Sequence, residues 1–363
     1  MLEGVRIIEV EGLGPGPFCG MLLADLGADV IVVHRPDGSM APGAPAENLL
    51  DRGKRSIALD LKSADDKAIF LDLVKTADGL IEGFRPGVME RLGLGPEDCH
   101  GVRPSLVYGR MTGWGQDGPR ALQAGHDLNY ASLSGAAWYA SPAGECPFTP
   151  PTVVGDIGGG ALYLAIGMLS GIFKARVGGQ GTVVDAAIVD GSAHMMNLLM
   201  SLKQAGGLAM ERGRSLLDGP HWSRTYRTKD GGFFSVQSLE PKFYAILLEK
   251  LGLSDDPDFR HQFDQRRWPA LNRRLEGLFA SRTRAEWAEC FAGSDACAAP
   301  VHAPQEAMDD PHMAARGVWQ APGGVLQAAA APRFDGRPAP APRPSPARDG
   351  DRDAILAEVG RAL

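Results

Sequence analysis

Residues 5–36, VRIIEVEGLGPGPFCGMLLADLGADVIVVHRP, decide the fold of this chain. The apolar run at residues 5–10 is typical of a strand, residues 11–17 form a glycine- and proline-rich turn, and residues 18–27 have helical spacing. A second apolar run follows and stops at Pro36. This order predicts a βαβ unit, in which two parallel strands are joined by a helix that crosses over the sheet.

The same alternation continues further along the chain and predicts an α/β fold with a Rossmann-like parallel sheet. We expect a long buried helix over residues 160–177, because that stretch is apolar and carries glycines and alanines. The other elements expected here are strands over residues 56–61, 78–84 and 105–115, a helix over residues 68–77, and a strand that leads into a helix over residues 181–190.

The pattern changes after about residue 190. A turn and strand over residues 230–240 and amphipathic helices over residues 241–253 and 268–294 predict a smaller α+β domain. The stretch from 322 to 350 is rich in Ala, Pro and Arg and favours an extended chain, before a short helix at the end. The predicted division is a large domain over 1–190, a linker over 191–220, a small domain over 221–320, and a return linker with a C-terminal helix over 321–363.

Composition excludes some classes of function. The 363 residues carry a net charge of −7, which argues against nucleic acid as the main partner but allows a local basic pocket for a phosphorylated ligand. Five cysteines without metal-binding spacing, and an acidic N-terminal start, indicate a cytoplasmic protein with reduced thiols. The uncharged run from Ile157 to Phe173 is read as a core helix rather than a membrane span.

The first glycine loop and the basic residues after it suggest a phosphorylated ligand. Gly12, Gly14 and Gly16 depart from the dinucleotide fingerprint, so a purely structural turn is an equal alternative. Arg35 follows the second strand and suits an adenosine phosphate, either the 2′-phosphate of NADP or the 3′-phosphate of coenzyme A. Arg85 lies in the turn GFRPG after a strand, where a guanidinium can pair with a phosphate.

Three further residues are candidates for proton chemistry. His126 precedes a helical pattern and is either a catalytic base or an ordinary helix entry. Asp156 lies among glycines that permit either close approach of a ligand or tight helix packing. Glu240 precedes a proline-started helix, where an N-cap role is the alternative to a functional one.

The motifs as a set resemble those of the α-methylacyl-CoA racemases in the class III (CaiB/BaiF-type) CoA-transferase superfamily, over residues 2–320 and less clearly beyond. The motifs, in their order, are GLGPGP (12–17), LLADLGADVIVVHRP (22–36), IALDLKS (57–63), IEGFRPGVMERLGLGPED (81–98), MTGWGQDGPR (111–120), AGHDLNY (124–130), VVGDIGGG (153–160) and VVDAAIVDG (183–191). The resemblance implies an interlocked homodimer, with each active site between the large domain of one chain and the small domain of the other.

The resemblance also implies roles for individual residues. His126 and Asp156 match the two catalytic acid/base residues, and Glu240 matches a small-domain carboxylate that reaches the partner chain's site near the histidine. We expect Asp127 to lie where a backbone N–H holds the enolate oxygen. The positions that match coenzyme A or thioester contacts are Arg35, Leu59, Asp60, Leu61, Lys62, Gly83, Phe84, Arg85, Arg91, Gly125, Asp127, Leu128, Asn129 and Tyr130.

The function so implied is inversion of the α-carbon of a 2-methylacyl-CoA thioester by two bases, one on each face of the carbon. The acyl-CoA is the substrate, and no metal, nicotinamide or flavin is expected as a cofactor. One alternative is a class III CoA-transferase, in which Asp156 is the nucleophile. Another is an NADP-dependent oxidoreductase that uses the first glycine loop, although its missing sixth-position glycine and two prolines weigh against it.

Overall fold

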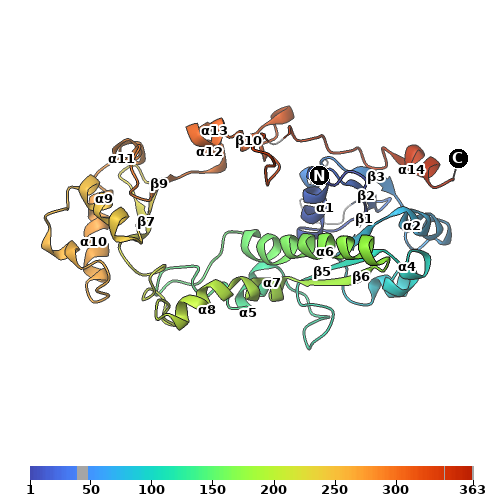
Figure 1. The fold of residues 1–363 in the computed structure, drawn as a ribbon, viewed down its shortest axis with the longest axis horizontal. Coiled ribbons are helices and arrows are strands. Elements are labelled where there is room, and N and C mark those ends of the chain that lie inside the picture. Colours follow the sequence, from blue (N-terminus) through green and yellow to red (C-terminus); the bar gives the residue numbers. More distant parts are fainter. Residues whose placement is uncertain (39–47, 339, 362–363) are drawn as a thin grey trace. The chain divides into compact units, whose positions relative to one another are not determined.

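The computed structural model describes residues 1–38, 48–338 and 340–361, and the last two residues of the expected C-terminal helix lie outside that range. The chain forms two compact units, each described separately below (Figure 1). The first comprises Met1–Ala137, Thr149–Met195 and Asp310–Leu363, and the second comprises Trp138–Phe148 and Met196–Asp309. Relative to the boundaries derived from the sequence, residues 138–148 join the second unit and residues 310–320 join the first.

The first unit contains a six-stranded sheet in the order β3-β2-β1-β4-β5-β6, and every neighbouring pair in it is parallel. The predicted α/β class and the first βαβ unit are therefore confirmed. From β1 the chain adds β2 and β3 on one side of the sheet and then β4, β5 and β6 on the other. The carboxyl ends of β1 and β4, where this direction changes, form the usual ligand crevice of such a sheet. The strands are β1 (Arg6–Val10), β2 (Asp29–His34), β3 (Arg55–Ala58), β4 (Gly79–Glu82), β5 (Val107–Thr112) and β6 (Thr182–Ala187), with a separate hairpin of β10 (Trp319–Gln320) and β11 (Gln327–Ala328).

Both faces of this sheet are covered by helices, because successive side chains of a strand point to opposite faces. Ile7 belongs to a core with α1 and α6, whereas Ile8 belongs to a second core with α2, α4 and α14. The helical elements of this unit are α1 (Pro15–Asp25), η1 (Leu49–Asp51), α2 (Ala64–Thr76), α3 (Val88–Leu92), α4 (Pro96–Val102), α5 (Asp127–Leu133), η2 (Val153–Ala161), α6 (Leu162–Gly178), α7 (Ile188–Met195), α13 (Pro311–Ala315), η4 (Pro322–Gly324) and α14 (Arg352–Glu358).

Helix α1 begins at Pro15, three residues before the start expected from the apolar spacing. Gly14 is its N-cap, with φ of 63°, a conformation that glycine adopts without strain. Pro15 and Pro17 lie in the first turn, where their missing N–H groups would have no helical partner. The residues that resemble a nucleotide-binding turn are thus partly the start of a helix.

The expected long buried helix is buried on one face only. Leu164 and Met168 of α6 are fully buried in the sheet core, but Ile166 and Phe173 are 60% and 73% exposed. One described helical stretch, Val153–Gly178, has the length and apolar composition of a membrane-crossing helix, and 39% of its most apolar window is buried. The predicted burial therefore holds for one face of α6, because periodicity cannot show whether the second apolar face of a helix has a partner.

The second unit is a three-stranded antiparallel sheet, in the order β7-β8-β9, packed with helices around an aromatic core. Strand β8 and helix α9 match the expected strand and helix, and this α+β unit confirms the predicted second domain type. The sequence did not reveal β7 or β9, because the first, SRTYR, is mostly polar and the second, AAPV, contains a proline. The elements are α8 (Asn197–Gln204), β7 (Ser223–Arg227), β8 (Phe233–Gln237), α9 (Pro241–Leu251), η3 (Pro257–Arg260), α10 (Trp268–Phe279), α11 (Arg284–Phe291), β9 (Ala298–Val301) and α12 (Pro304–Asp309).

Candidate active site

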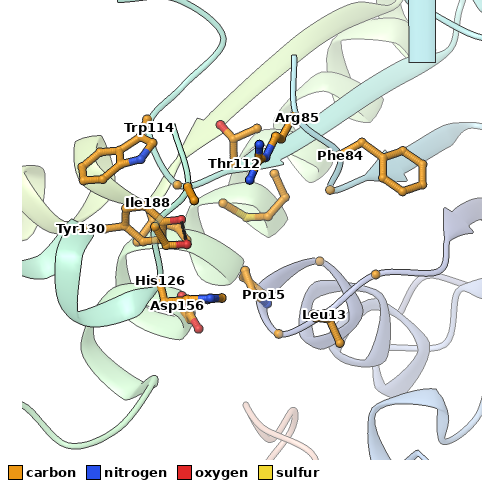
Figure 2. Close-up of a pocket in the computed structure, with 18 of the residues that line it drawn as sticks. Leu13, Pro15, Phe84, Arg85, Thr112, Trp114, His126, Tyr130, Asp156 and Ile188 are labelled. Atoms are coloured by element: carbon orange, nitrogen blue, oxygen red, sulfur yellow. Dashed lines mark hydrogen bonds between the residues drawn. The ribbon is translucent and has the colours of Figure 1, made fainter. Parts of the chain in front are cut away.

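A cavity of about 470 Å³ lies at the carboxyl ends of β1, β4 and β5 in the first unit. Its walls are the loop and helix start after β1, the turn Gly83–Pro86 after β4, and the loop Thr112–Trp114 after β5. His126 and Asp156 line the same cavity, and Figure 2 shows their side chains beside each other below Tyr130. The topology of the sheet therefore brings together residues that lie far apart in the sequence.

A second cavity of about 650 Å³ adjoins the first, since Val10 and Phe84 line both. Its walls come from the chain after β2, including Arg35, and from residues 59–62 after β3. The Arg35 guanidinium lies over the Phe84 ring, 5.8 Å from its centroid. One elongated ligand with a charged end could occupy both cavities.

His126 is the N-cap residue of α5, the position that the helix-entry alternative required. Its ring, however, makes no capping hydrogen bond among the described residues. Instead, the side chain of Asn129, in the first turn of α5, accepts the backbone N–H of His126 at 3.0 Å. The helix start thus fixes the backbone of His126 and leaves its exposed ring available to a ligand.

Asp156 lies in η2, a π-helical turn that precedes α6. Such turns are rare and occur often at functional sites. Burial and the negative charge of Asp127 raise the pKa of Asp156 to about 6, and the nearby His126 acts against this shift. A carboxyl with that pKa can both accept and donate a proton near neutral pH.

The carboxylate of Asp127 holds the backbone that carries Asp156. It is buried, and its two oxygens accept the Asp156 N–H at 2.8 Å and the Thr152 N–H at 3.2 Å. Thr152 adopts a φ of 61°, so this bond holds a backbone conformation that is unfavourable for a threonine. We expected only the backbone of Asp127 to take part, and no sequence pattern pointed to this side-chain role.

The sequence left open whether the glycines around Asp156 permit close approach of a ligand or tight helix packing. In the structure they serve tight packing. A Cβ atom at position 155 would lie 2.4 Å from the Asp127 carboxylate, and one at position 159 would lie 2.3 Å from the Ser192 hydroxyl of α7. Glycine is therefore required where Asp127 reaches the backbone and where η2 packs on α7.

The predicted site residues divide into groups by their place in the structure. Glu240 is the exposed N-cap residue of α9 in the second unit, without a side-chain capping bond, so the structure of one chain does not place it relative to His126. Gly83, Phe84, Arg85, Gly125, His126, Tyr130 and Asp156 line the first cavity; Arg35, Leu59, Asp60, Leu61, Lys62 and Phe84 line the second; Arg91, Leu128 and Asn129 are exposed and are not among the lining residues.

Sequence reasoning missed two carboxylates near strand ends that hold the cavity loops. Glu82 accepts the Phe84 N–H at 2.7 Å, and Glu11 accepts the Arg35 N–H at 2.8 Å. Burial raises the pKa of Glu82 to about 7, although the Phe84 amide and Arg110 oppose the shift. The signal that could have revealed both is a glutamate followed by glycine at the end of an apolar strand, in VEG and IEG.

This chain belongs to the CoA-transferase family III, whose family model matches residues 2–352. Among its relatives, the α-methylacyl-CoA racemase of Mus musculus is 40% identical over 349 residues, which cover 96% of this chain and 88% of that protein. The succinyl-CoA–D-citramalate CoA-transferase of Chloroflexus aurantiacus is 30% identical over 336 residues, which cover 87% and 82% of the two chains.

A solved structure of a CaiB/BaiF family protein from Brucella suis matches 98% of both chains with a TM-score of 0.81 and 26% identity. The family resemblance inferred from the motifs is therefore confirmed, and it extends past residue 320.

Proposed function

We propose that this protein is an α-methylacyl-CoA racemase, an isomerase that inverts the α-carbon of 2-methylacyl-CoA thioesters. The observation that carries the proposal is a pair of acid/base side chains, His126 and Asp156, which come from separate elements and line the same cavity. The 40% identity to the mouse racemase supports the same function.

The mechanism follows from the chemistry of the two side chains. The His126 imidazole removes the α-proton of the S thioester, and protonated Asp156 delivers a proton to the opposite face of the enolate. For the R thioester the roles are exchanged, so ionised Asp156 is the base and the His126 imidazolium is the acid. The pKa of about 6 makes both forms of Asp156 accessible near neutrality.

The enolate oxygen would be stabilised at the start of α5. Because α5 begins at Asp127, its first amide groups have no carbonyl partner within the helix and can donate to an oxyanion. The reaction leaves the oxidation state of the substrate unchanged, so the proposal requires no redox cofactor. The amide groups at the start of α5 take the charge-stabilising role that a metal would otherwise have.

The coenzyme A part of the substrate would lie along the two adjoining cavities. The thioester end would occupy the cavity with His126, and the adenosine end would occupy the cavity that Arg35 and residues 59–62 line. Arg35 is exposed at that second cavity and can pair with the 3′-phosphate of the adenosine.

We further propose a homodimer in which Glu240 of one chain reaches the site of the other. Its carboxylate would orient the His126 ring and balance the charge of the imidazolium. Glu240 is exposed at a helix start and makes no capping bond, so its carboxylate is available for such a contact.

The test is exchange of the α-proton in heavy water across a panel of 2-methylacyl-CoA thioesters, without an acceptor acid. The wild-type protein should exchange the α-proton from both epimers. His126→Ala should slow exchange by roughly 100-fold or more, since it removes a general acid/base. Unchanged exchange in this variant would refute the two-base mechanism.

A class III CoA-transferase is the second candidate function, because the family includes enzymes such as the Chloroflexus transferase. In that reaction the Asp156 carboxylate would attack the thioester carbonyl, expel the coenzyme A thiolate and form a mixed anhydride. Hydroxylamine would trap that anhydride and inactivate the protein in the presence of acyl-CoA. A racemase should retain its activity under the same treatment.

A further inference from the structure

The backbone of Arg35 is held at both of its polar groups. Glu11 accepts the Arg35 N–H at 2.8 Å, and Arg348 donates to the Arg35 carbonyl oxygen at 2.7 Å. Arg348 also donates to the Glu11 carboxylate at 2.8 Å, so the three residues form a closed ring of contacts. Arg348 lies 313 residues further along the chain than Arg35.

The Glu11 carboxylate of this ring is largely shielded from solvent, whereas Arg348 and the Arg35 side chain are exposed. The side chains of Glu11 and Arg348 are 14% and 34% exposed. The ring of His34 is buried beside them, and its Nδ1 lies 3.4 Å from the Glu11 carboxylate. The Arg35 side chain itself is exposed at the second cavity, so its guanidinium remains available to an anion while its backbone is held.

The same C-terminal segment also holds the end of β3. Asp349 accepts the Ala58 N–H at 2.7 Å, and Arg352 donates to the Ala58 carbonyl oxygen at 2.8 Å. Strand β3 is at the edge of the sheet, where backbone groups would otherwise lack partners. Since Leu59 lines the second cavity, residues 348–352 hold two of the chain segments that line it, the one after β2 and the one after β3.

We propose that Glu11 and Arg348 are positioning residues that hold Arg35 for the 3′-phosphate of coenzyme A, and that the C-terminal segment thereby belongs to the nucleotide subsite. This inference rests on the proposed function, because it takes the second cavity as the place of the adenosine. An arginine whose backbone is already fixed loses less conformational freedom when it binds a phosphate, which strengthens binding.

The test compares the binding of coenzyme A with that of 3′-dephospho-coenzyme A by titration calorimetry. Arg348→Gln should weaken binding of coenzyme A by about tenfold, the order expected for one charge-assisted contact. Binding of the dephospho form should change by less than about twofold. A defect of the whole fold would weaken both ligands alike, so the ratio of the two affinities separates positioning from general damage.

Arg343→Gln is the matched control. Arg343 belongs to the same segment and donates to a backbone carbonyl, that of Ala24 in α1, at 2.6 Å. It is not among the residues that line the two cavities. We expect this variant to leave the ratio of the two affinities unchanged.

Two further variants keep the test decisive if Arg348→Gln does not fold. Glu11→Gln removes the charge partner of Arg348, and Arg348→Lys replaces the branched guanidinium by a single ammonium that matches its two acceptors less well. Both variants should reduce the ratio of the affinity for coenzyme A to that for the dephospho form, as Arg348→Gln does. If every folded variant of this ring left the ratio unchanged, the positioning role would be wrong.

Arg35→Ala distinguishes failure of this inference from failure of the proposed function. It should abolish the preference for coenzyme A over the dephospho form, and Arg348→Gln should then cause no further loss of that preference. If Arg35→Ala itself left the preference intact, the assignment of Arg35 to the 3′-phosphate would fail. If Arg35→Ala reduced this preference but the Glu11 and Arg348 variants did not, Arg35 would still be assigned to the 3′-phosphate, and the positioning role of Glu11 and Arg348 would be wrong.

Discussion

Asp156 and Asp127 show how one side chain can set both the position and the proton affinity of another. Asp127 accepts the Asp156 N–H, and its negative charge is one of two causes that raise the pKa of the Asp156 carboxyl. The other and larger cause is burial. Because the proposed reaction needs a single proton shared between His126 and Asp156, the pH dependence of activity reports on this arrangement.

Asp127→Asn should shift the acid limb of the pH profile of kcat/KM to lower pH by roughly one unit. The amide keeps one oxygen, which can accept one of the two backbone N–H groups that Asp127 holds, and it removes the like charge. Ionised Asp156 therefore becomes more favourable and its pKa falls. The measurement is the rate of racemisation of each epimer against pH. The pH profiles of the two epimers should have the same acid and basic limbs. The forms of the enzyme that react with each epimer differ only in whether His126 or Asp156 holds the proton.

Asp117→Asn is the control for that profile, since Asp117 is exposed and its carboxylate is not among the causes of the Asp156 shift. Its profile should match that of the wild-type protein. An acid limb that stays in place or moves to higher pH in Asp127→Asn would contradict the assigned electrostatic coupling.

At the scale of elements, a buried ion pair joins β1 to the loop before β3. The Lys54 ammonium is fully buried and lies within 2.8 Å of both oxygens of the Glu9 carboxylate. It also donates to the Pro17 carbonyl oxygen in the first turn of α1, at 3.2 Å. The pair thus connects the core of the sheet to the helix start that lines the first cavity.

Lys54→Met should lower the free energy of unfolding by about 3–5 kcal/mol, because it leaves the Glu9 carboxylate buried without a counter-charge. Burial already raises the pKa of Glu9, and Lys54 opposes that shift, so its removal raises this pKa further. The folded protein then holds a proton that the unfolded chain releases, and stability falls as pH rises above the unfolded pKa. Urea denaturation should therefore show that Lys54→Met lowers the free energy of unfolding by less at pH 5 than at pH 8.

Lys75→Met provides the comparison for an exposed pair. Lys75 is 53% exposed and pairs with Asp72 at 2.7 Å. Its removal should cost less than about 1 kcal/mol and should show no comparable dependence on pH. If Lys54→Met lowered the free energy of unfolding as little as Lys75→Met does, the buried pair would not stabilise the fold.

At the scale of the whole molecule, the proposed dimer makes each active site depend on two chains. His126→Ala and Glu240→Ala should each be inactive as homodimers. A purified heterodimer of the two variants should regain about half the activity of the wild-type dimer, because one of its two sites combines an intact His126 with an intact Glu240. Racemisation by differently tagged, co-expressed chains measures this directly.

The control is the heterodimer of His126→Ala with Asp156→Ala. Both residues lie in the first unit of one chain, so neither site of this heterodimer can be complete. It should remain inactive. Activity in the control, or none in the first heterodimer, would contradict a site shared between chains through Glu240.

Most of the main sheet could be predicted from the sequence, because parallel strands buried on both faces are continuous apolar runs separated by turns and helical spacing. The strands β7 and β9 were missed, since their segments SRTYR and AAPV contain no apolar run without a charged residue or a proline. The exposed face of α6 was also missed, because an apolar pattern does not reveal which of its faces is covered.

The sequence by itself determined the parallel α/β class, the family and the candidate pair of His126 and Asp156, since these depend on local periodicity and on motifs. Only the tertiary structure decided that Asp127 holds the Asp156 backbone and that Glu11 and Arg348 hold Arg35. These contacts join residues 24 to 337 positions apart. No local pattern specifies such pairs, because chain folding alone brings their donors and acceptors within hydrogen-bond distance.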